Sequence, residues 1–378
     1  MSRSPDSERF WLDVLSGERR GLAFDLLRGA LAGAAGLYVG GLEVYLALER
    51  CGLRRRERLA APVISIGNLA SGGTGKTPVT HYLAGRLAHF GLRTAILSRG
   101  HGGSRSILGA VVSDGGGRIF LNASEAGDEA LALARLLPAV PVFVGKDRRV
   151  SGRKALAAHA PDAVLLDDGL QYWQLARDLD IVLLDARRPF ENGYTLPRGL
   201  LREPKEHLRR AGIVLATRAD LASRQQRDAV AAAARNLAPK ADFFFARHVI
   251  TGLRALNEAA RGQGEPHLAL PVCGIAQPEA FRALLERAAA PITPQMVALS
   301  DHAAYGPGEV RRIRGKMKDQ HADAVVTTDK DAVKIDAEAL DFPVYSAALG
   351  VALDRPEAFD AALLARAGLA ARMSRAST

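Results

Sequence analysis

The chain has 378 residues, 48% of them apolar, so it is long enough for more than one globular domain and is not a disordered protein. Its net charge of +10 indicates an anionic partner. Because aromatic residues are scarce and no nucleic-acid module is present, we expect a membrane surface or a phosphorylated substrate and no nucleic acid. The two cysteines, Cys51 and Cys273, have no metal-ligand spacing, and we infer no obligate protein partner.

Residues 1–60 are predicted to form a membrane-associated helix with a basic flank. The segment from Gly21 to Leu48 is rich in Leu, Ala, Gly and Val, and several arginines follow it. Gly29–Leu48 provides about twenty residues, marginally enough to span a bilayer, but Glu43 lies within it. We favour an interfacial helix or a weak single anchor whose arginines meet anionic headgroups. A soluble helix packed on the next domain is the alternative.

A glycine-rich turn follows the apolar strand Pro62–Ile66 and leads into a helix that starts at a Lys-Thr pair. Such a turn lets backbone N–H groups converge on phosphate oxygens, while the lysine supplies charge and the threonine hydroxyl reaches a magnesium ion. The strict P-loop pattern is not met, because Ala70 stands where the first glycine is expected. An ordinary βα turn is the alternative. The candidate nucleotide-binding residues are Ala70, Ser71, Gly72, Gly73, Thr74, Gly75, Lys76 and Thr77.

Strand-like and helical segments alternate through residues 61–245, which we interpret as a P-loop kinase core. Nearly continuous apolar strands separated by helices predict a doubly wound, mainly parallel α/β sheet. Ligands of such sheets collect beyond the carboxyl ends of the strands. The expected strands are Pro62–Ile66, Thr94–Ser98, Pro141–Val144, Ala163–Leu166, Asp180–Leu184 and Gly212–Ala216, and the expected helices are Val79–Phe90, Ala126–Leu136, Arg149–His159 and Leu221–Leu237.

Two carboxylates end the fourth of these strands. Asp167 and Asp168 follow the strand directly, and Gln171 lies one turn further on. A magnesium ion bound to nucleotide phosphates needs one or two carboxylates plus water. Either aspartate can serve, together with Thr77 and Gln171, so these four residues are the candidate metal ligands. A plain Asp-Gly turn is the alternative.

A smaller α/β domain is predicted over residues 246–378, with a hinge strand at its start. Its elements again alternate, which predicts a second sheet covered by helices. The expected strands are Phe243–Ile250, Leu268–Cys273, Gln295–Leu299, Ala324–Thr327 and Val344–Ala347, and the expected helices are Pro278–Ala289, Gly308–Lys318 and Arg355–Ala371.

Several polar residues outside the glycine-rich turn are further candidates. Asp128 opens a helix, where it could simply cap the first turn, and His302 lies in a loop, where it could simply be exposed. As a pair they could also supply a general base for an acceptor hydroxyl. Arg99 and Arg202 lie in Gly/Pro-rich loops that suit phosphate recognition, and Lys330 could reach the cleft between the domains. Thr217-Arg-Ala-Asp220 is a weak match to a guanine-reading pattern.

Eight segments in order resemble the tetraacyldisaccharide 4'-kinase family, the lipid A 4'-kinases of bacteria with an outer membrane. Singly each segment is modest, but together they span nearly the whole chain behind a membrane-like helix. They are Gly67-Asn-Leu with Gly-Gly-Thr-Gly-Lys-Thr-Pro78, Ser98-Arg-Gly100, Gly127-Asp-Glu129, Asp167-Asp-Gly-Leu-Gln171, Leu201-Arg-Glu-Pro204, Cys273-Gly-Ile275, Asp301-His302 and Thr327-Thr-Asp-Lys-Asp-Ala-Val-Lys334.

The resemblance implies ATP- and Mg²⁺-dependent transfer of the γ-phosphoryl group to the 4'-hydroxyl of a tetraacylated glucosamine disaccharide 1-phosphate, giving lipid IVA. It implies two α/β domains joined by a hinge, at the cytoplasmic face of the inner membrane. It assigns residues 70–77 to the ATP phosphates and residues 167–171 to the magnesium region. It also makes Asp128 and His302 a catalytic dyad, with Asp128 as general base.

Two other functions fit parts of the sequence. A regulatory P-loop NTPase explains the glycine-rich turn and Asp167 but gives no role to the N-terminal helix or the second domain. A membrane-bound nucleotide sensor without enzymatic activity is the third choice. The destination of the γ-phosphate separates the three: lipid, water or neither.

Overall fold

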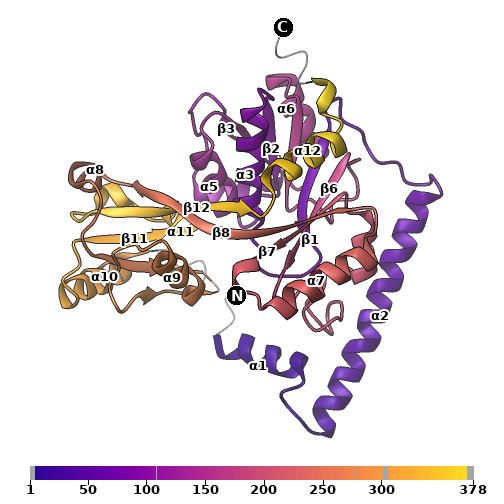
Figure 1. Cartoon of the computed structure of the whole chain (residues 1–378), viewed down its shortest axis with the longest axis horizontal. Helices are drawn as coiled ribbons and strands as arrows, with labels where there is room; N and C mark the ends of the chain where they lie inside the picture. Colours follow the sequence, from indigo (N-terminus) through magenta and orange to yellow (C-terminus); the bar gives the residue numbers. More distant parts are fainter. Residues whose placement is uncertain (1–4, 108, 276, 301–304, 373–378) are drawn as a thin grey trace.

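The computed structural model describes residues 5–107, 109–275, 277–300 and 305–372 (Figure 1). Its strands are β1 Val63–Asn68, β2 Thr94–Ser98, β3 Ala110–Asp114, β4 Pro141–Val144, β5 Ala163–Asp167, β6 Leu179–Asp185, β7 Ile213–Thr217, β8 Asp242–Ala255, β9 Ala269–Cys273, β10 Val297–Ala298, β11 Ala324–Thr328 and β12 Val344–Leu353. Its α-helices are α1 Pro5–Ser16, α2 Leu22–Arg50, α3 Lys76–His89, α4 Ala123–Ala126, α5 Asp128–Leu136, α6 Arg148–His159, α7 Arg224–Leu237, α8 Glu258–Gln263, α9 Pro278–Arg287, α10 Pro307–Asp319, α11 Asp329–Ala332 and α12 Pro356–Arg366.

The P-loop core is a doubly wound sheet, as predicted. β1 lies between β5 and β6, and the order across the core is β3-β4-β2-β5-β1-β6-β7-β8. Side chains alternate between two buried layers: Ile64 and Ile66 pack with α3 and α5, whereas Val63 packs with α6 on the other face. Every residue of β1 is buried. Covered on both faces, the parallel strands must be apolar throughout, which is why the sequence shows continuous apolar runs.

One strand of the core differs from the predictions. β3 pairs antiparallel with β4 at the edge of the sheet, and we expected no strand there. Its burial is uneven, so its sequence lacks the continuous apolar run of the central strands. An antiparallel edge strand on a parallel sheet is common in α/β proteins.

The long strand β8 joins the two lobes of the molecule. Its first part, Asp242 to Phe245, pairs parallel with β7. Its remainder, Ala246 to Ala255, pairs antiparallel with β12. Figure 1 shows these two strands running side by side from the core to the smaller lobe. All twelve strands therefore form one sheet, and the domain boundary at residue 246 stays a prediction.

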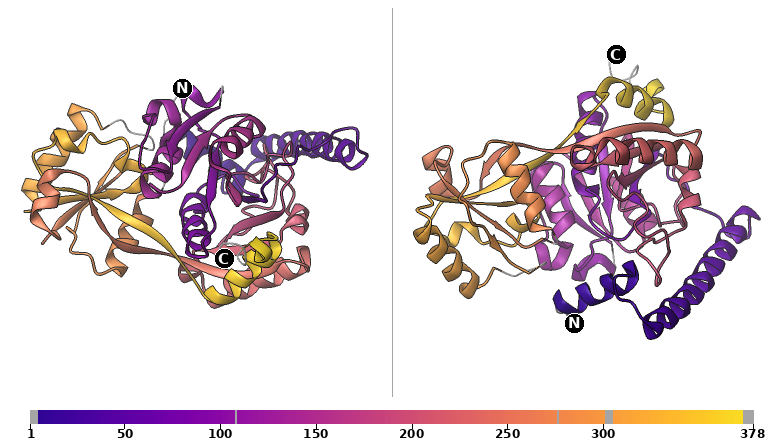
Figure 2. Two further views of the ribbon diagram at one scale, coloured as in Figure 1. Left: turned by 90° about the horizontal axis from the view of Figure 1, so that it is seen from above. Right: turned by 60° about the horizontal axis from the view of Figure 1, so that its bottom comes forward.

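The smaller lobe is built around β9, β10, β11 and the first residues of β12. β11 pairs in parallel with both β9 and β12, and β10 adds an edge of only two residues where we expected a longer strand. Helix α10 covers this sheet with Ile313 and Met317. Figure 2 shows the lobe standing beside the core, connected through the β8 and β12 ribbon.

Helix α12 packs on the core, although we had grouped its sequence with the smaller domain. Phe359 is fully buried between the rings of Tyr82 and Phe244, whose centroids lie 6.1 and 5.3 Å away. Asp360 accepts hydrogen bonds from the guanidinium of Arg86 on α3. The chain thus returns through β12 to its starting lobe, and α12 closes the core.

The N-terminal helix α2 stands away from the sheet (Figure 2). By length and composition it could cross a membrane, with a mean hydropathy of 1.5, and 11% of its most apolar window is buried. Tyr38 donates to the backbone oxygen of Arg202 at 2.7 Å, and Glu43 lies 2.6 Å from His207 Nε2. The carboxylate that argued against a simple span therefore faces the core.

Truncation of Phe359 tests the importance of the α12 contact. We expect Phe359→Ala to lower the free energy of unfolding by about 3–5 kcal/mol, because it removes a buried ring from between two others. Phe120→Ala is the matched control, since that ring is 45% exposed, and it should cost about 1 kcal/mol or less. Urea denaturation measures both; equal losses would contradict the packing role of α12.

Candidate active site

The predicted phosphate cradle, residues 70–77, forms the turn between β1 and α3. Gly75 adopts a left-handed conformation with φ of +83° and precedes the first residue of α3. A Cβ atom at this position would overlap the imidazole of His248 on β8. Gly72 also has positive φ, at +123°, and nothing lies within 4 Å of a Cβ built there or at Gly73. The turn therefore presents open backbone to an incoming group, next to a helix N-terminus that favours anions.

Neighbouring segments hold this turn from outside. Ser71 N–H donates to Leu200 O at 2.6 Å, and Arg202 N–H donates to Leu69 O at 2.6 Å. On the other side, Thr217 Oγ1 donates to Thr74 O at 3.0 Å, and Arg218 donates to Gly73 O. The weak guanine-type motif thus braces the turn. Thr74 Oγ1 is buried without a hydrogen-bond partner among the described residues, so it is available to a phosphate oxygen.

The ammonium group of Lys76 contacts two oxygen atoms beside the glycine-rich turn. Its ammonium lies 3.4 Å from Asn68 Oδ1 and 3.7 Å from Asp168 Oδ1. Only 12% of its side chain is exposed, so the charge depends on these neighbours. A phosphate that enters the turn can replace Asn68 and Asp168 as the partner of Lys76. The residues of the turn therefore fit a nucleoside triphosphate.

The two aspartates after β5 occupy different environments. Asp167 is fully buried and accepts a 2.9 Å hydrogen bond from Thr80; burial, with Glu129 and Asp168 nearby, raises its pKa to about 7. Asp168 is 28% exposed and lies 3.1 Å from Arg202 Nη1. Although burial opposes ionisation, Lys76 and Arg202 lower the pKa of Asp168. Asp168 therefore carries the charge that faces the turn.

Gln171 connects this cluster to a carboxylate that the sequence analysis missed. Its amide nitrogen donates to Asn68 O at 3.0 Å and to Glu203 Oε1 at 2.9 Å, while its oxygen accepts from Arg202 at 3.3 Å. Glu203 is buried and follows Arg202 directly, so the Leu201–Pro204 motif already contained the signal.

The oxygen donors around the turn suit a hard divalent cation. Asp168, Gln171 and the hydroxyl of Thr77 are the ligand types that magnesium takes alongside phosphate oxygens. Among the described residues, no three His, Cys, Asp or Glu side chains form a ready metal cluster. The oxygen donors present are of the kind that holds magnesium beside nucleotide phosphates in kinases.

Asp128 lies at the first position of α5, and Lys334 Nζ approaches its Oδ2 at 3.4 Å. Its predicted partner, His302, lies outside the described residues. Lys330 is half-buried on α11, and Arg99 is exposed at the end of β2. The structure therefore brings together Lys76, Asp168, Gln171 and Arg202. Asp128, on the core helix α5, contacts Lys334 of the smaller lobe.

Arg148 is a second residue that sequence reasoning missed. It begins α6 just beyond β4, is buried, and has its guanidinium 4.8 Å from the centre of the Tyr172 ring. Burial lowers its pKa, and the charge of Arg99 lowers it further. The available signal was the segment Gly145-Lys-Asp-Arg148, which directly follows a strand at the same edge of the sheet.

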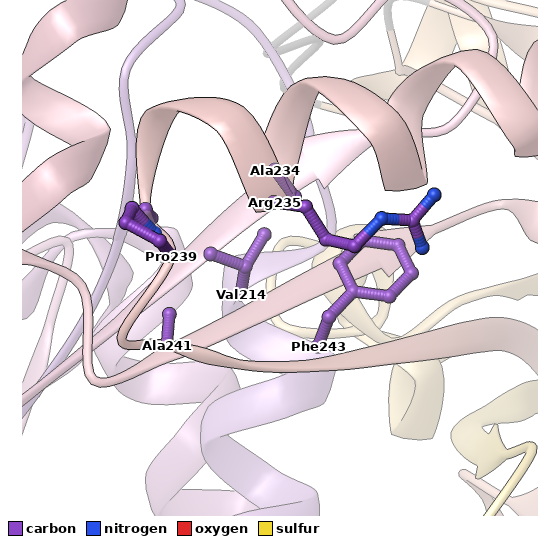
Figure 3. A pocket seen from close by; sticks show the side chains of 7 residues that line it. Val214, Ala234, Arg235, Pro239, Ala241 and Phe243 are labelled. Carbon is purple, nitrogen blue, oxygen red and sulfur yellow. The ribbon is translucent and has the colours of Figure 1, made fainter.

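A pocket of about 270 Å³ lies elsewhere, between α7 and the outer strands of the core. Figure 3 shows Pro239 and Ala241 at one side of it and Arg235 and Phe243 at the other. Its floor includes Val214, near the amino end of β7, whereas Thr217 at the carboxyl end braces the glycine-rich turn. This pocket is thus separate from the candidate active site.

Comparison with known proteins gives consistent matches. A family model described as tetraacyldisaccharide-1-P 4'-kinase matches residues 27–368. A Geobacter sulfurreducens protein named tetraacyldisaccharide 4'-kinase is 42% identical over 364 residues, covering 94% of this chain and 98% of that protein. An Anaeromyxobacter dehalogenans protein of the same name is 42% identical over 334 residues, covering 85% of each. The crystal structure of LpxK from Aquifex aeolicus in complex with ATP has a TM-score of 0.69 and 27% identity, covering 90% of this chain and 99% of that chain.

The buried carboxylate of Asp167 leads to a pH-dependent prediction. Its pKa of about 7 in the folded protein lies above the value of 3.8 for an unperturbed aspartate, so ionisation favours the unfolded state as pH rises from about 4 to 7. We expect Asp167→Asn to raise the unfolding temperature of the nucleotide-free protein at pH 8. The corresponding gain in the free energy of unfolding, at most about 4 kcal/mol, should vanish near pH 4.

Asp185→Asn is the matched control with the opposite sign. Arg187 and Arg218 lower the pKa of Asp185 to about 2 despite its burial, so the ionised form stabilises the fold above about pH 4. This variant should be less stable than the parent at pH 8. Differential scanning fluorimetry across pH 4–8 compares the two, and a destabilised Asp167→Asn at pH 8 would contradict the assignment.

Proposed function

The chain belongs to the tetraacyldisaccharide 4'-kinase family, and we propose how its residues divide the work of that family's reaction. It is an ATP-dependent kinase of lipid A biosynthesis that transfers the γ-phosphoryl group to the 4'-hydroxyl of tetraacyldisaccharide 1-phosphate, forming lipid IVA. Membership of this kinase family favours the kinase over the two alternatives, a regulatory NTPase and a nucleotide sensor. The observation that supports the residue roles best is the contact of Lys76 with Asp168 at the open glycine-rich turn.

The turn 70–77 is proposed to hold the ATP phosphates. Its exposed glycines offer backbone N–H groups, and Lys76 would exchange its acceptors for phosphate oxygens. The negative charge that spreads over the transferring group requires such fixed positive charge. Arg202, which now pairs with Asp168, lies close enough to share this role or to contact the lipid substrate.

Magnesium is proposed to bind beside Thr77, Asp167, Asp168 and Gln171. When bound, it neutralises charge on the phosphates as phosphoryl transfer proceeds. Asp168 is the stronger candidate for direct contact, because its carboxylate is partly exposed and ionised, whereas Asp167 is buried and bound to Thr80. Asp167 would then influence the magnesium ion indirectly, through Asp168 or through a water molecule.

Asp128 is proposed as the general base that accepts the proton of the 4'-hydroxyl, with His302 assisting it. A base at this place suits in-line transfer, because α5 begins beside Gly100 and His101, which follow β2, and its Glu129 acts on Asp167 at the end of β5. The glycolipid is proposed to contact Arg99, Arg202 and Lys330, whose charges suit its 1-phosphate.

The N-terminal helix is proposed to hold the enzyme on the cytoplasmic face of the inner membrane, where an acylated substrate would lie. Five exposed aliphatic residues of α2 lie on one stripe, and its buried residues, Ala35 and Leu46, lie on the opposite side. Because Tyr38 and Glu43 contact the core, we favour a helix that lies in the interface over one that spans the bilayer. The stripe is Leu22, Leu26, Leu37, Val44 and Leu48.

The base role of Asp128 predicts a selective loss of turnover. We expect Asp128→Asn to lower kcat about a hundredfold or more while changing the ATP Kd by less than about threefold. The assay follows labelled γ-phosphate onto tetraacyldisaccharide 1-phosphate and, separately, into free phosphate. Turnover equal to that of the parent enzyme would remove Asp128 from this role.

Two further variants calibrate this measurement. Lys76→Ala should weaken ATP binding as well as turnover, because it removes charge from both the ground state and the transition state. Asp228→Asn, an exposed carboxylate on α7, should change neither quantity. Label that appears only as free phosphate with the parent enzyme would contradict the transfer reaction itself.

The apolar stripe predicts membrane binding that depends on two leucines. We expect the double variant Leu26→Glu, Leu37→Glu to bind vesicles of phosphatidylethanolamine and phosphatidylglycerol at least about tenfold more weakly, since burial of each leucine contributes about 1.5–3 kcal/mol. Leu221→Glu, an exposed leucine of the core, is the control. Vesicle flotation measures all three proteins, and unchanged flotation of the double variant would contradict the interfacial role.

A further inference from the structure

Lys334, the last residue of the Thr327–Lys334 motif, is almost completely buried. Only 6% of its side chain is exposed, yet its ammonium is within ion-pair distance of two carboxylates. It lies 3.4 Å from Asp128 Oδ2 in the core and 3.3 Å from Asp331 Oδ1 in the smaller lobe. A buried lysine stays charged only when such partners compensate it.

Asp331 fixes one side of this arrangement. It is fully buried, and its Oδ2 accepts hydrogen bonds from Thr328 Oγ1 at 2.7 Å and from Gly274 N–H at 2.9 Å. Its Oδ1 faces Lys334. Both oxygens of Asp331 are thus engaged, so the lysine is anchored from the smaller lobe before it reaches Asp128.

The backbone around Lys334 is also held against α5. Arg135, near the end of α5, donates to Ala332 O at 3.2 Å. Val333 is buried within the hydrophobic cluster of the core. The segment that carries Lys334 is therefore tied to both ends of the helix that begins with Asp128.

We propose that Lys334 is a positioning residue for Asp128, which it holds in a fixed, charged arrangement from the opposite lobe. This inference rests on the proposed role of Asp128 as the base. By engaging Oδ2, the ammonium fixes the plane of the carboxylate toward the acceptor hydroxyl. It also offsets the negative charge of Asp331, the second carboxylate within ion-pair distance.

The contact between Lys334 and Asp128 makes the orientation of the base depend on how the two lobes are placed. Asp128 belongs to the lobe that holds the nucleotide turn, whereas Asp331 and Lys334 belong to the segment after β11. The ion pair forms only when α11 lies against α5, so the base is correctly oriented only in that arrangement.

Lys334→Met tests the proposal, since methionine keeps most of the length of the side chain and removes its charge. We expect kcat for phosphoryl transfer to fall at least about tenfold, with the ATP Kd changed by less than about threefold. Lys334→Arg, which keeps the charge, should recover most of the lost turnover. Lys316→Met, on an exposed face of α10, is the matched control and should retain the parent kcat.

A double-mutant comparison separates positioning from general structural support. In an Asp128→Asn background, Lys334→Met should lower kcat by no more than about twofold, because the group through which it acts is already absent. Independent, multiplicative losses would overturn the proposal, as would a Lys334→Met enzyme with parent turnover. If Lys334→Met does not fold, Lys334→Gln, which retains a hydrogen-bond donor for Asp331, carries the same expectations.

The same measurements distinguish failure of this proposal from failure of the base assignment. If Asp128→Asn keeps the parent kcat, the base role falls and the positioning role falls with it. If Asp128→Asn is impaired while Lys334→Met is not, the base role stands and only the positioning role is overturned.

Discussion

The pairing of β8 with two different strands is the constraint on which the rest of the structure depends. One half of this strand extends the parallel core and the other half forms an antiparallel ladder with β12. Because the ladder extends from Ala246 to Ala255 with one register shift, the smaller lobe cannot be placed independently of the core. It sets where β11 ends and therefore where Lys334 meets α5. The return of the chain through β12 then delivers α12, which closes the core over Phe359.

Charge balance is the second organising factor, because several acidic side chains meet where they are largely buried. Burial raises the pKa of Asp167 to about 7, which favours its protonated form. Despite burial, Lys76 and Arg202 lower the pKa of Asp168, which favours its ionised form. Lys76 and Asp168 lie within ion-pair distance of each other. A triphosphate would bring negative charge to this cluster, and Lys76 and Arg202 could then exchange carboxylate oxygens for phosphate oxygens.

The sequence predicted what depends on local pattern. The six parallel strands of the core, the glycine-rich turn and the acidic end of β5 each follow from apolar runs and short spacings, and each is present. Sequence alone could not show that α12 packs on the core, because an amphipathic helix does not identify the sheet it covers. Nor could it choose between Lys330 and Lys334 in one motif, since both are lysines in a charged segment and only the fold brings Lys334 to Asp128. Arg148 and Glu203 were missed because each becomes significant through its neighbours in space.

Glu43 shows how one residue can carry opposite meanings in sequence and in structure. Within an apolar helix, a carboxylate argues against a membrane span, since an ionised group in hydrocarbon is costly. In the fold it lies 2.6 Å from His207, whose other ring nitrogen lies 2.9 Å from Glu203. Hydrogen bonds to Glu203 and Glu43 raise the pKa of His207, which favours its charged form between the two acids. Since Glu203 also binds Gln171, the contact that docks the apolar helix is continuous with the polar cluster at the nucleotide turn. A chain of polar contacts through Glu43, His207 and Glu203 thus connects the helix that would meet lipid to the site that would meet ATP.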